Sequence, residues 1–273
     1  MNAREAAAEL APRLATAGVA DAGFEAEYLV RIAAGISRTE YFRGHQMCGD
    51  ARARLEAVAA RRLGREPAAY IHGEREFHGL VFEVSPDVLL PRPETEMLVE
   101  IALKECALLS APVVVDVGTG SGAIAVALGR HLTRARMIGV DVSMPALAVA
   151  RRNAERHGAA VRFVRGDLLA AFRRADVVLA NLPYIPSAEI AGLEPEVRDW
   201  EPRLALDGGA DGRELIRRLI DDCAARIRPR LLALEVGVGQ AEAVAEHCQC
   251  RGAQTEVLLD LAGIERVVCA RWG

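Results

Sequence analysis

From about residue 111 onward, the chain alternates between short apolar runs and helical patterns, and this alternation constrains the fold more than any other feature. The apolar runs are typical of buried strands, and five of them occur in succession: 113–115, 137–140, 161–164, 176–180 and 231–236. Short apolar strands joined by helices predict an α/β fold with a mostly parallel sheet that is covered on both faces. Residues 255–259 and 266–270 are expected to add a terminal antiparallel pair.

The chain before residue 111 has different sequence patterns, which predict two further parts. Residues 1–72 carry apolar stripes at helical spacing, with glycines between the stripes where helices end. Residues 76–84 alternate between polar and apolar types and include residues that favour β-strands, and the turn sequence Ser-Pro-Asp follows them. We therefore expect a small helical bundle domain over 1–72, a β-hairpin linker over 73–92, and the α/β domain over 93–273.

Composition excludes several classes of protein. A hydrophobic fraction of 51% in 273 residues is enough for a sizeable core, and a formal net charge of −4 argues against a clamp for long nucleic acid. No run approaches about 18 uncharged apolar residues, so no membrane span is expected. Charged residues interrupt the start of the chain, which argues against a signal peptide. The scattered cysteines and histidines predict reduced thiols and no metal site, so we expect a cytoplasmic protein.

A glycine-rich loop follows the first strand, at the edge where ligands bind in open α/β sheets. Glycines let the backbone approach a ligand closely, and the helix N-terminus that follows favours an anionic group. The spacing Gly-x-Gly-x-Gly differs from the Gly-x-Gly-x-x-Gly fingerprint of dinucleotide-binding proteins. We expect this loop to contribute the following cofactor-binding residues: Asp116, Gly118, Thr119, Gly120, Ser121 and Gly122.

The next two strands end in carboxylates that suit a nucleoside. Asp141, with Val142 after it, follows the second strand, and a carboxylate at this position can accept hydrogen bonds from both ribose hydroxyls. After the third strand, Asp167 is expected to accept from an exocyclic adenine amine, and Leu168 to lie against the ring. Asp141 suits NAD equally well, so these residues predict a nucleoside and not a particular cofactor.

The most specific motif, Asn181-Leu182-Pro183-Tyr184, follows the fourth strand. An amide nitrogen is a poor nucleophile because its lone pair is delocalised into the carbonyl, and acceptors for both N–H hydrogens raise its electron density in the transition state. We expect Asn181 Oδ1 and the Leu182 carbonyl to be these acceptors. Pro183 makes the loop rigid, and Tyr184 offers a face for a planar group. The motif predicts in-line methyl transfer from a sulfonium to a planar nitrogen, with Asn181, Pro183 and Tyr184 as the catalytic residues.

With these motifs, nearly the whole chain resembles the HemK-type (PrmC) release factor glutamine methyltransferases. The resemblance implies that the helical domain over 1–72 docks the protein substrate. It implies a Rossmann-like seven-stranded methyltransferase domain that uses S-adenosyl-L-methionine. It also implies that a monomer methylates the glutamine N5 in the Gly-Gly-Gln loop of peptide chain release factors. The family's cofactor contacts carry over onto Gly118, Gly120, Gly122, Asp141, Leu168 and Asn181. Further matching segments are 69–73, 76–77, 91–96, 201–202, 205–206, 208–212, 235–237 and 239–240.

Two residues depart from the family pattern. The family loop is usually Asn-Pro-Pro-Tyr, and Leu182 stands at its second position. Because the expected acceptor there is a backbone carbonyl, leucine can supply it, although the loop loses one stiffening ring. Leu168 stands where some relatives have an aromatic residue over the adenine, which weakens stacking on the cofactor.

Two alternatives remain open at this point. A nucleic-acid adenine N6-methyltransferase has a similar loop, because an exocyclic amine is delocalised in the same way. The acidic net charge and the interleaved arginines and acids of the helical part favour a protein substrate without direct nucleic-acid contact. The other alternative is an NAD-dependent enzyme or a nucleotide-binding module without catalysis. The glycine spacing and the Asn181–Tyr184 motif count against both of these.

Overall fold

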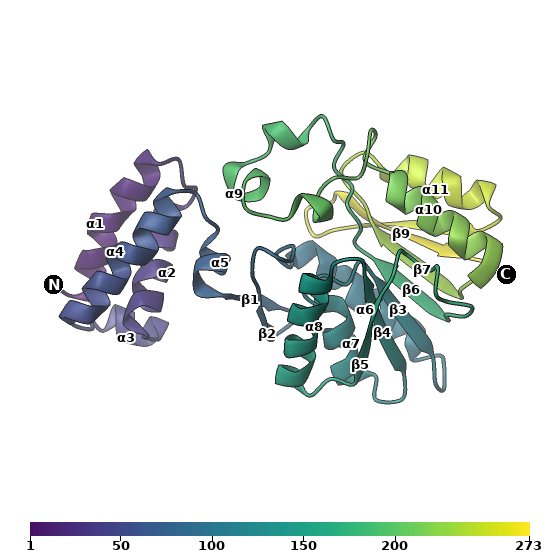
Figure 1. Ribbon diagram of the computed structural model, residues 1–273, viewed down its shortest axis with the longest axis horizontal. Helices are drawn as coiled ribbons and strands as arrows, with labels where there is room; N and C mark the ends of the chain where they lie inside the picture. Colours follow the sequence, from purple (N-terminus) through teal and green to yellow (C-terminus); the bar gives the residue numbers. More distant parts are fainter. The chain divides into compact units, whose positions relative to one another are not determined.

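A computed structural model describes residues 1–273 and divides them into two compact units (Figure 1). The first unit contains residues 1–73 together with 194–200, and the second contains residues 74–193 and 201–273. No sequence pattern indicated that the short segment 194–200, which interrupts the second unit, belongs with the N-terminal helices.

The first unit is entirely helical, as its apolar stripes predicted. Its helices are α1 (Ala3–Thr16), α2 (Ala22–Ala34), α3 (Arg38–Phe42), α4 (Gly49–Leu63), α5 (Ala68–His72) and α9 (Pro195–Arg198). Alanines and leucines of α1, α2 and α4 form most of its core. The buried guanidinium of Arg62 donates to Glu25 at 3.1 Å and to Glu196 at 2.9 Å, which fastens segment 194–200 to the bundle.

The second unit is built on the predicted seven-stranded sheet, in the order β5-β4-β3-β6-β7-β9-β8. Pairing is parallel from β5 through β7, and β9 is antiparallel to both of its neighbours. The sequence therefore predicted the parallel core and the terminal antiparallel pair correctly. The strands are β3 (Val113–Val117), β4 (Arg136–Asp141), β5 (Val161–Arg165), β6 (Val177–Ala180), β7 (Leu231–Glu235), β8 (Gln254–Leu259) and β9 (Glu265–Arg271).

Helices cover both faces of this sheet (Figure 1). Alternate residues of each central strand face opposite ways, so that Val114 packs with one helical layer and Val115 with the other. The first layer consists of α6 (Glu96–Cys106), α7 (Ala123–His131) and α8 (Met144–His157), and the second of α10 (Glu214–Asp222) and α11 (Ala241–Cys250). None of the helices in either unit is long and apolar enough to cross a membrane.

The predicted hairpin is also present, as β1 (Glu74–Phe77) paired antiparallel with β2 (Leu80–Glu83). The hairpin is part of the second unit, and Asn153, a fully buried residue of α8, holds it against the rest of that unit. The Glu83 N–H donates to Asn153 Oδ1 at 2.7 Å, and Asn153 Nδ2 donates to the carbonyls of Glu83 and Ser121 at 3.0 and 2.9 Å. One side chain therefore ties the hairpin to the glycine-rich loop after β3.

Candidate active site

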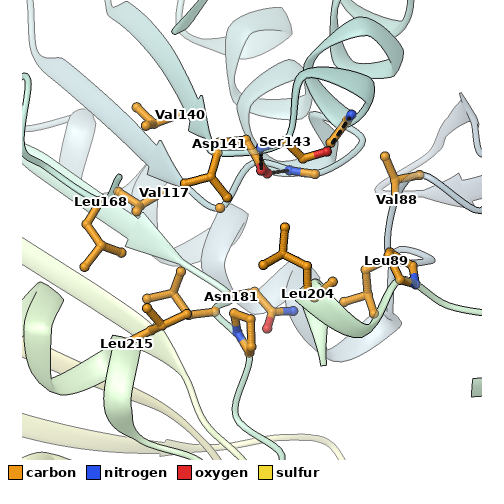
Figure 2. Close-up of a pocket in the computed structure, with 18 of the residues that line it drawn as sticks. Val88, Leu89, Val117, Val140, Asp141, Ser143, Leu168, Asn181, Leu204 and Leu215 are labelled. Atoms are coloured by element: carbon orange, nitrogen blue, oxygen red, sulfur yellow. Dashed lines mark hydrogen bonds between the residues drawn. The ribbon is translucent and has the colours of Figure 1, made fainter. Parts of the chain in front are cut away.

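A cavity of about 380 Å³ opens where β3, β4, β5 and β6 end (Figure 2). Its volume lies within the usual range for small-molecule sites, and most of its lining side chains are apolar, as such sites require. All of the lining residues belong to the second unit. Besides the strand-end residues described below, the lining includes Asp87, Val88, Leu89, Ala146, Pro202, Leu204, Ala205 and Leu215.

The three glycines of the loop after β3 have different structural roles. Gly118 and Gly120 line the cavity, and both have positive φ angles, +74° and +54°. Gly122 does not line the cavity. A Cβ on Gly122 would lie 3.1 Å from the Cβ of Ala150, so this glycine allows α7 to pack closely on α8. Only the first two glycines therefore bring backbone to the cavity wall.

Asp116 supports the same loop from behind. Its side chain is fully buried, and Oδ2 accepts a hydrogen bond from Thr119 Oγ1 at 2.6 Å, while Oδ1 has no partner. Burial raises the pKa of Asp116 to about 7. Asp116, Thr119 and Ser121, which were predicted to bind the cofactor, lie outside the cavity lining. Their hydrogen bonds stabilise the conformation of the loop.

Asp141 connects two loops at the cavity wall (Figure 2). Its Oδ2 accepts from the Gly120 N–H and its Oδ1 from the Ser143 N–H, both at 2.9 Å. Ser143 in turn caps α8 by accepting from the Ala146 N–H at 3.2 Å. Each carboxylate oxygen has a further acceptor site, so Asp141 can still bind hydroxyl groups in the cavity. The neighbouring Val142 also lines the wall and is 42% exposed.

The loop after β5 brings Asp167 and Leu168 to the cavity. Asp167 is half exposed and pairs with Arg218 of α10 at 2.6 Å, a partner that the sequence did not reveal. Leu168 has a φ of +47°, an unusual left-handed conformation for a leucine, and its side chain is 7% exposed. Packing in the core holds this side chain in place.

Asn181 begins the loop after β6 and lines the cavity together with Leu182 and Pro183. Its Nδ2 donates to Thr95 Oγ1 at 3.1 Å, and Thr95 Oγ1 donates to Glu235 Oε2 at 2.6 Å. Sequence reasoning did not single out Thr95 or Glu235, although both lie in segments that match the family pattern, 91–96 and 235–237. Glu235 was nevertheless detectable, because it ends a fully apolar strand in the same way as Asp141.

Close backbone contacts support the remainder of this loop. A Cβ on Gly212 would overlap the carbonyl oxygen of Tyr184, and a Cβ on Gly208 would lie 2.6 Å from the carbonyl oxygen of Pro183. Gln240 Nε2 donates to the Tyr184 carbonyl at 2.8 Å. Tyr184 itself is not part of the cavity lining, and burial raises its pKa to about 12. Gly208 and Gly212 therefore allow the 208–212 segment to pack closely against the loop.

Comparisons with known proteins match both parts of the chain. The PrmC N-terminal domain family matches residues 5–73, and the methyltransferase domain family matches residues 114–200. A release factor glutamine methyltransferase from Geobacter sulfurreducens is 42% identical, with 95% of this chain and 93% of the relative aligned. The enzyme of the same name from Cereibacter sphaeroides is 43% identical over 99% of both chains.

Solved structures show the same fold at low identity. The hMettl16 catalytic domain in complex with the MAT2A 3'UTR hairpin 6 has a TM-score of 0.58 at 15% identity, with 79% of this chain and 82% of that chain covered. The T. thermophilus 16S rRNA N2 G1207 methyltransferase (RsmC), in complex with AdoMet and guanosine, has a TM-score of 0.52 at 19% identity. The match covers 73% of this chain and 50% of that chain. These likenesses establish the Rossmann-like methyltransferase architecture of the second unit.

Proposed function

The chain belongs to the release factor glutamine methyltransferase family, and we propose that it transfers the methyl group of S-adenosyl-L-methionine to the N5 nitrogen of a release factor glutamine. The glutamine is the one in the Gly-Gly-Gln loop of a peptide chain release factor. The observation that carries this proposal is that two residues of the cavity lining have an acceptor oxygen bonded to no group of the chain, Asn181 Oδ1 and the Leu182 carbonyl. Two acceptors match the two hydrogens of a primary amide.

The cavity fits the proposed cofactor. Gly118 and Gly120 expose backbone at its wall, Asp141 presents a carboxylate with unused acceptor sites, and the apolar lining includes Leu168 and Leu215. S-adenosyl-L-methionine supplies an electrophilic methyl group on a positively charged sulfur. The chain has to hold that group in line with the nitrogen and keep water away from it.

The acceptor pair addresses the main difficulty of the reaction, which is the low nucleophilicity of an amide nitrogen. Asn181 and Leu182 follow a central strand and are fixed by packing, with Leu182 only 4% exposed. Acceptors held in place before the reaction stabilise the positive charge that develops on the N–H hydrogens as the nitrogen attacks. No strong base is needed, because the proton leaves after the C–N bond has formed.

The helical unit, which matches the PrmC N-terminal domain, is proposed to dock the release factor. We further propose that the enzyme acts as a monomer in the cytoplasm. Its six cysteines are all unpaired, which suits a reducing compartment.

The test is to incubate the protein with methyl-labelled S-adenosyl-L-methionine and an unmethylated release factor. Peptide mass spectrometry then locates the label. A factor with the loop glutamine changed to alanine is run beside the wild-type factor, and DNA and RNA are offered in parallel. Label on the loop glutamine alone supports the proposal. Label on nucleic-acid adenines, with none on the factor, would replace it by the adenine N6-methyltransferase alternative.

A further inference from the structure

Three side chains from distant parts of the sequence form a chain of hydrogen bonds that ends at the cavity. Asn181 follows β6, Thr95 precedes α6, and Glu235 ends β7. Asn181 Nδ2 lies 3.1 Å from Thr95 Oγ1, which lies 2.6 Å from Glu235 Oε2. Thr95 is 5% exposed and Glu235 is 2% exposed, so bulk water does not compete for these bonds.

Thr95 ends the 3₁₀ turn Pro93–Thr95, which runs directly into α6, and its backbone angles are already helical (φ −66°, ψ −20°). A residue whose side chain caps a helix normally has an extended backbone instead. Its hydroxyl makes no capping hydrogen bond here and instead joins Asn181 and Glu235. The hydroxyl is therefore committed to the site and not to the helix.

The direction of each bond follows from the chemistry of the groups. When Glu235 is ionised, its carboxylate can only accept, so Thr95 must donate its single hydrogen to Glu235. Thr95 Oγ1 is then available only as an acceptor, and the only end of the Asn181 carboxamide that can donate to it is Nδ2. Oδ1 is consequently left without a partner in the chain. A free acceptor is what the N–H of an incoming amide requires.

We propose that Thr95 and Glu235 are positioning residues that determine which end of the Asn181 carboxamide faces the substrate nitrogen. This inference rests on the function proposed above. Neither residue lines the cavity, so both would act through Asn181. Which group donates in each of these hydrogen bonds depends on whether Glu235 is ionised. We therefore also expect the rate of the reaction to depend on pH.

Several charged and titratable groups surround Glu235. Arg92 and Glu94 lie in the segment before α6, Tyr184 lies in the loop after β6, and Arg266 lies on β9. Burial outweighs the two arginines and raises the pKa of Glu235 to about 7. A protonated Glu235 can donate to Thr95, and Thr95 can then donate to a rotated Asn181. Rotation would turn Nδ2, a donor, toward the N–H groups of the substrate, so the rate should fall as the pH drops below about 7.

The first test compares three threonine variants by kcat for release factor methylation and by Kd for S-adenosylhomocysteine. Thr95→Val should lower kcat roughly 10- to 100-fold with Kd nearly unchanged, because the displaced acceptor spoils geometry more than affinity. Thr95→Ser restores a hydroxyl and should recover most of the rate. Thr255→Val is the matched control, because Thr255 also accepts from a side-chain amide, that of Gln249 at 2.7 Å, outside the site.

The second test is the pH profile of Glu235→Gln. The substituted amide can still accept from Thr95 and does not titrate, so the wild-type decline in kcat on the acidic side should disappear. An acidic decline that persists in this variant overturns the inference. The inference also fails if Thr95→Val and Thr95→Ser lose equal rate, or if Thr95→Val loses none. Failure of the proposed function is distinct, because the wild-type enzyme would then leave the loop glutamine unlabelled.

Discussion

The loop after β3 and the loop after β6 lie side by side at one edge of the sheet but are held in different ways. In the first, residues 118–122, the supports are close in sequence, on the adjacent strand β4, or on the helix α8 that follows β4. The N–H groups of Gly118 and Thr119 donate to the Val140 carbonyl at 2.8 and 2.9 Å, and Thr119 bonds to Asp116 three residues earlier. The glycines then provide the backbone conformations that the turn requires.

The second loop, residues 181–184, depends on segments far away in the sequence. Thr95 lies 86 residues before Asn181, and Gln240 lies 56 residues after Tyr184. Glycines of the 208–212 segment approach its carbonyl oxygens closely. The comparison indicates that the proposed cofactor loop is specified mainly by local sequence, whereas the proposed substrate loop is specified by the packed domain.

Asn181→Ala should have the largest effect, because it removes the proposed acceptor directly. We expect kcat to fall by about 100- to 1,000-fold, the loss typical of a preorganised polar group at a reacting centre. The Kd for S-adenosylhomocysteine should rise by less than about tenfold, in line with one hydrogen bond. Single-turnover methylation and calorimetry measure the two quantities. A variant that keeps its rate would remove Asn181 from the reaction.

Gly212→Ala tests whether distant backbone supports the substrate loop. The added Cβ would overlap the Tyr184 carbonyl, so the loop must shift, and we expect kcat to fall about 100-fold. Gly252→Ala is the matched control. Its φ of +81° is similar to the +73° of Gly212, but nothing lies within 4 Å of an added Cβ. Equal losses of rate in both variants would attribute the effect to backbone strain and not to the contact.

Gly118→Ala tests the loop after β3, and here the effect should fall on cofactor affinity. The φ of +74° strains an alanine, and its Cβ would lie 3.1 Å from Leu182 Cδ2 at the cavity wall. We expect the Kd for S-adenosylhomocysteine to rise about tenfold, equivalent to roughly 1.4 kcal/mol. Calorimetric titration measures it. If the variant instead loses rate at saturating cofactor while its Kd stays constant, the loop after β3 contributes to the rate and not to cofactor affinity, which contradicts the comparison.

Asp116→Asn should have the smallest effect, which concerns stability. Burial raises the pKa of Asp116 from 3.8 to about 7, so the native state binds more protons than the unfolded state in this window. Stability therefore falls as the pH rises through it. Asparagine does not titrate. Between about pH 6 and about pH 7, the free energy of unfolding of the variant should therefore fall by about 1 kcal/mol less than that of the wild type. Urea unfolding at the two pH values measures the difference, and parallel losses would contradict the raised pKa.

Local patterns predicted most of the fold and part of the candidate site. Helical spacing predicted the first unit, and apolar runs predicted the strands, because side-chain periodicity reports directly on burial. Gly118, Asp141, Leu168 and Asn181 were placed at the cavity by the rule that ligands bind at the carboxyl ends of strands. The rule did not separate residues at the wall from residues behind it, such as Asp116 and Thr119, since both kinds follow the same strand.

The sequence by itself determined the order of the elements, the parallel core of the sheet and the glycine-rich turn, because these depend on periodicity and local conformational preference. Only the tertiary structure decided which residues meet across the fold. It joined segment 194–200 to the helical unit through Arg62, and it joined Thr95 and Glu235 to Asn181. Such contacts depend on the register of strands and the packing of helices over long sequence separations. No single segment of the sequence contains that information.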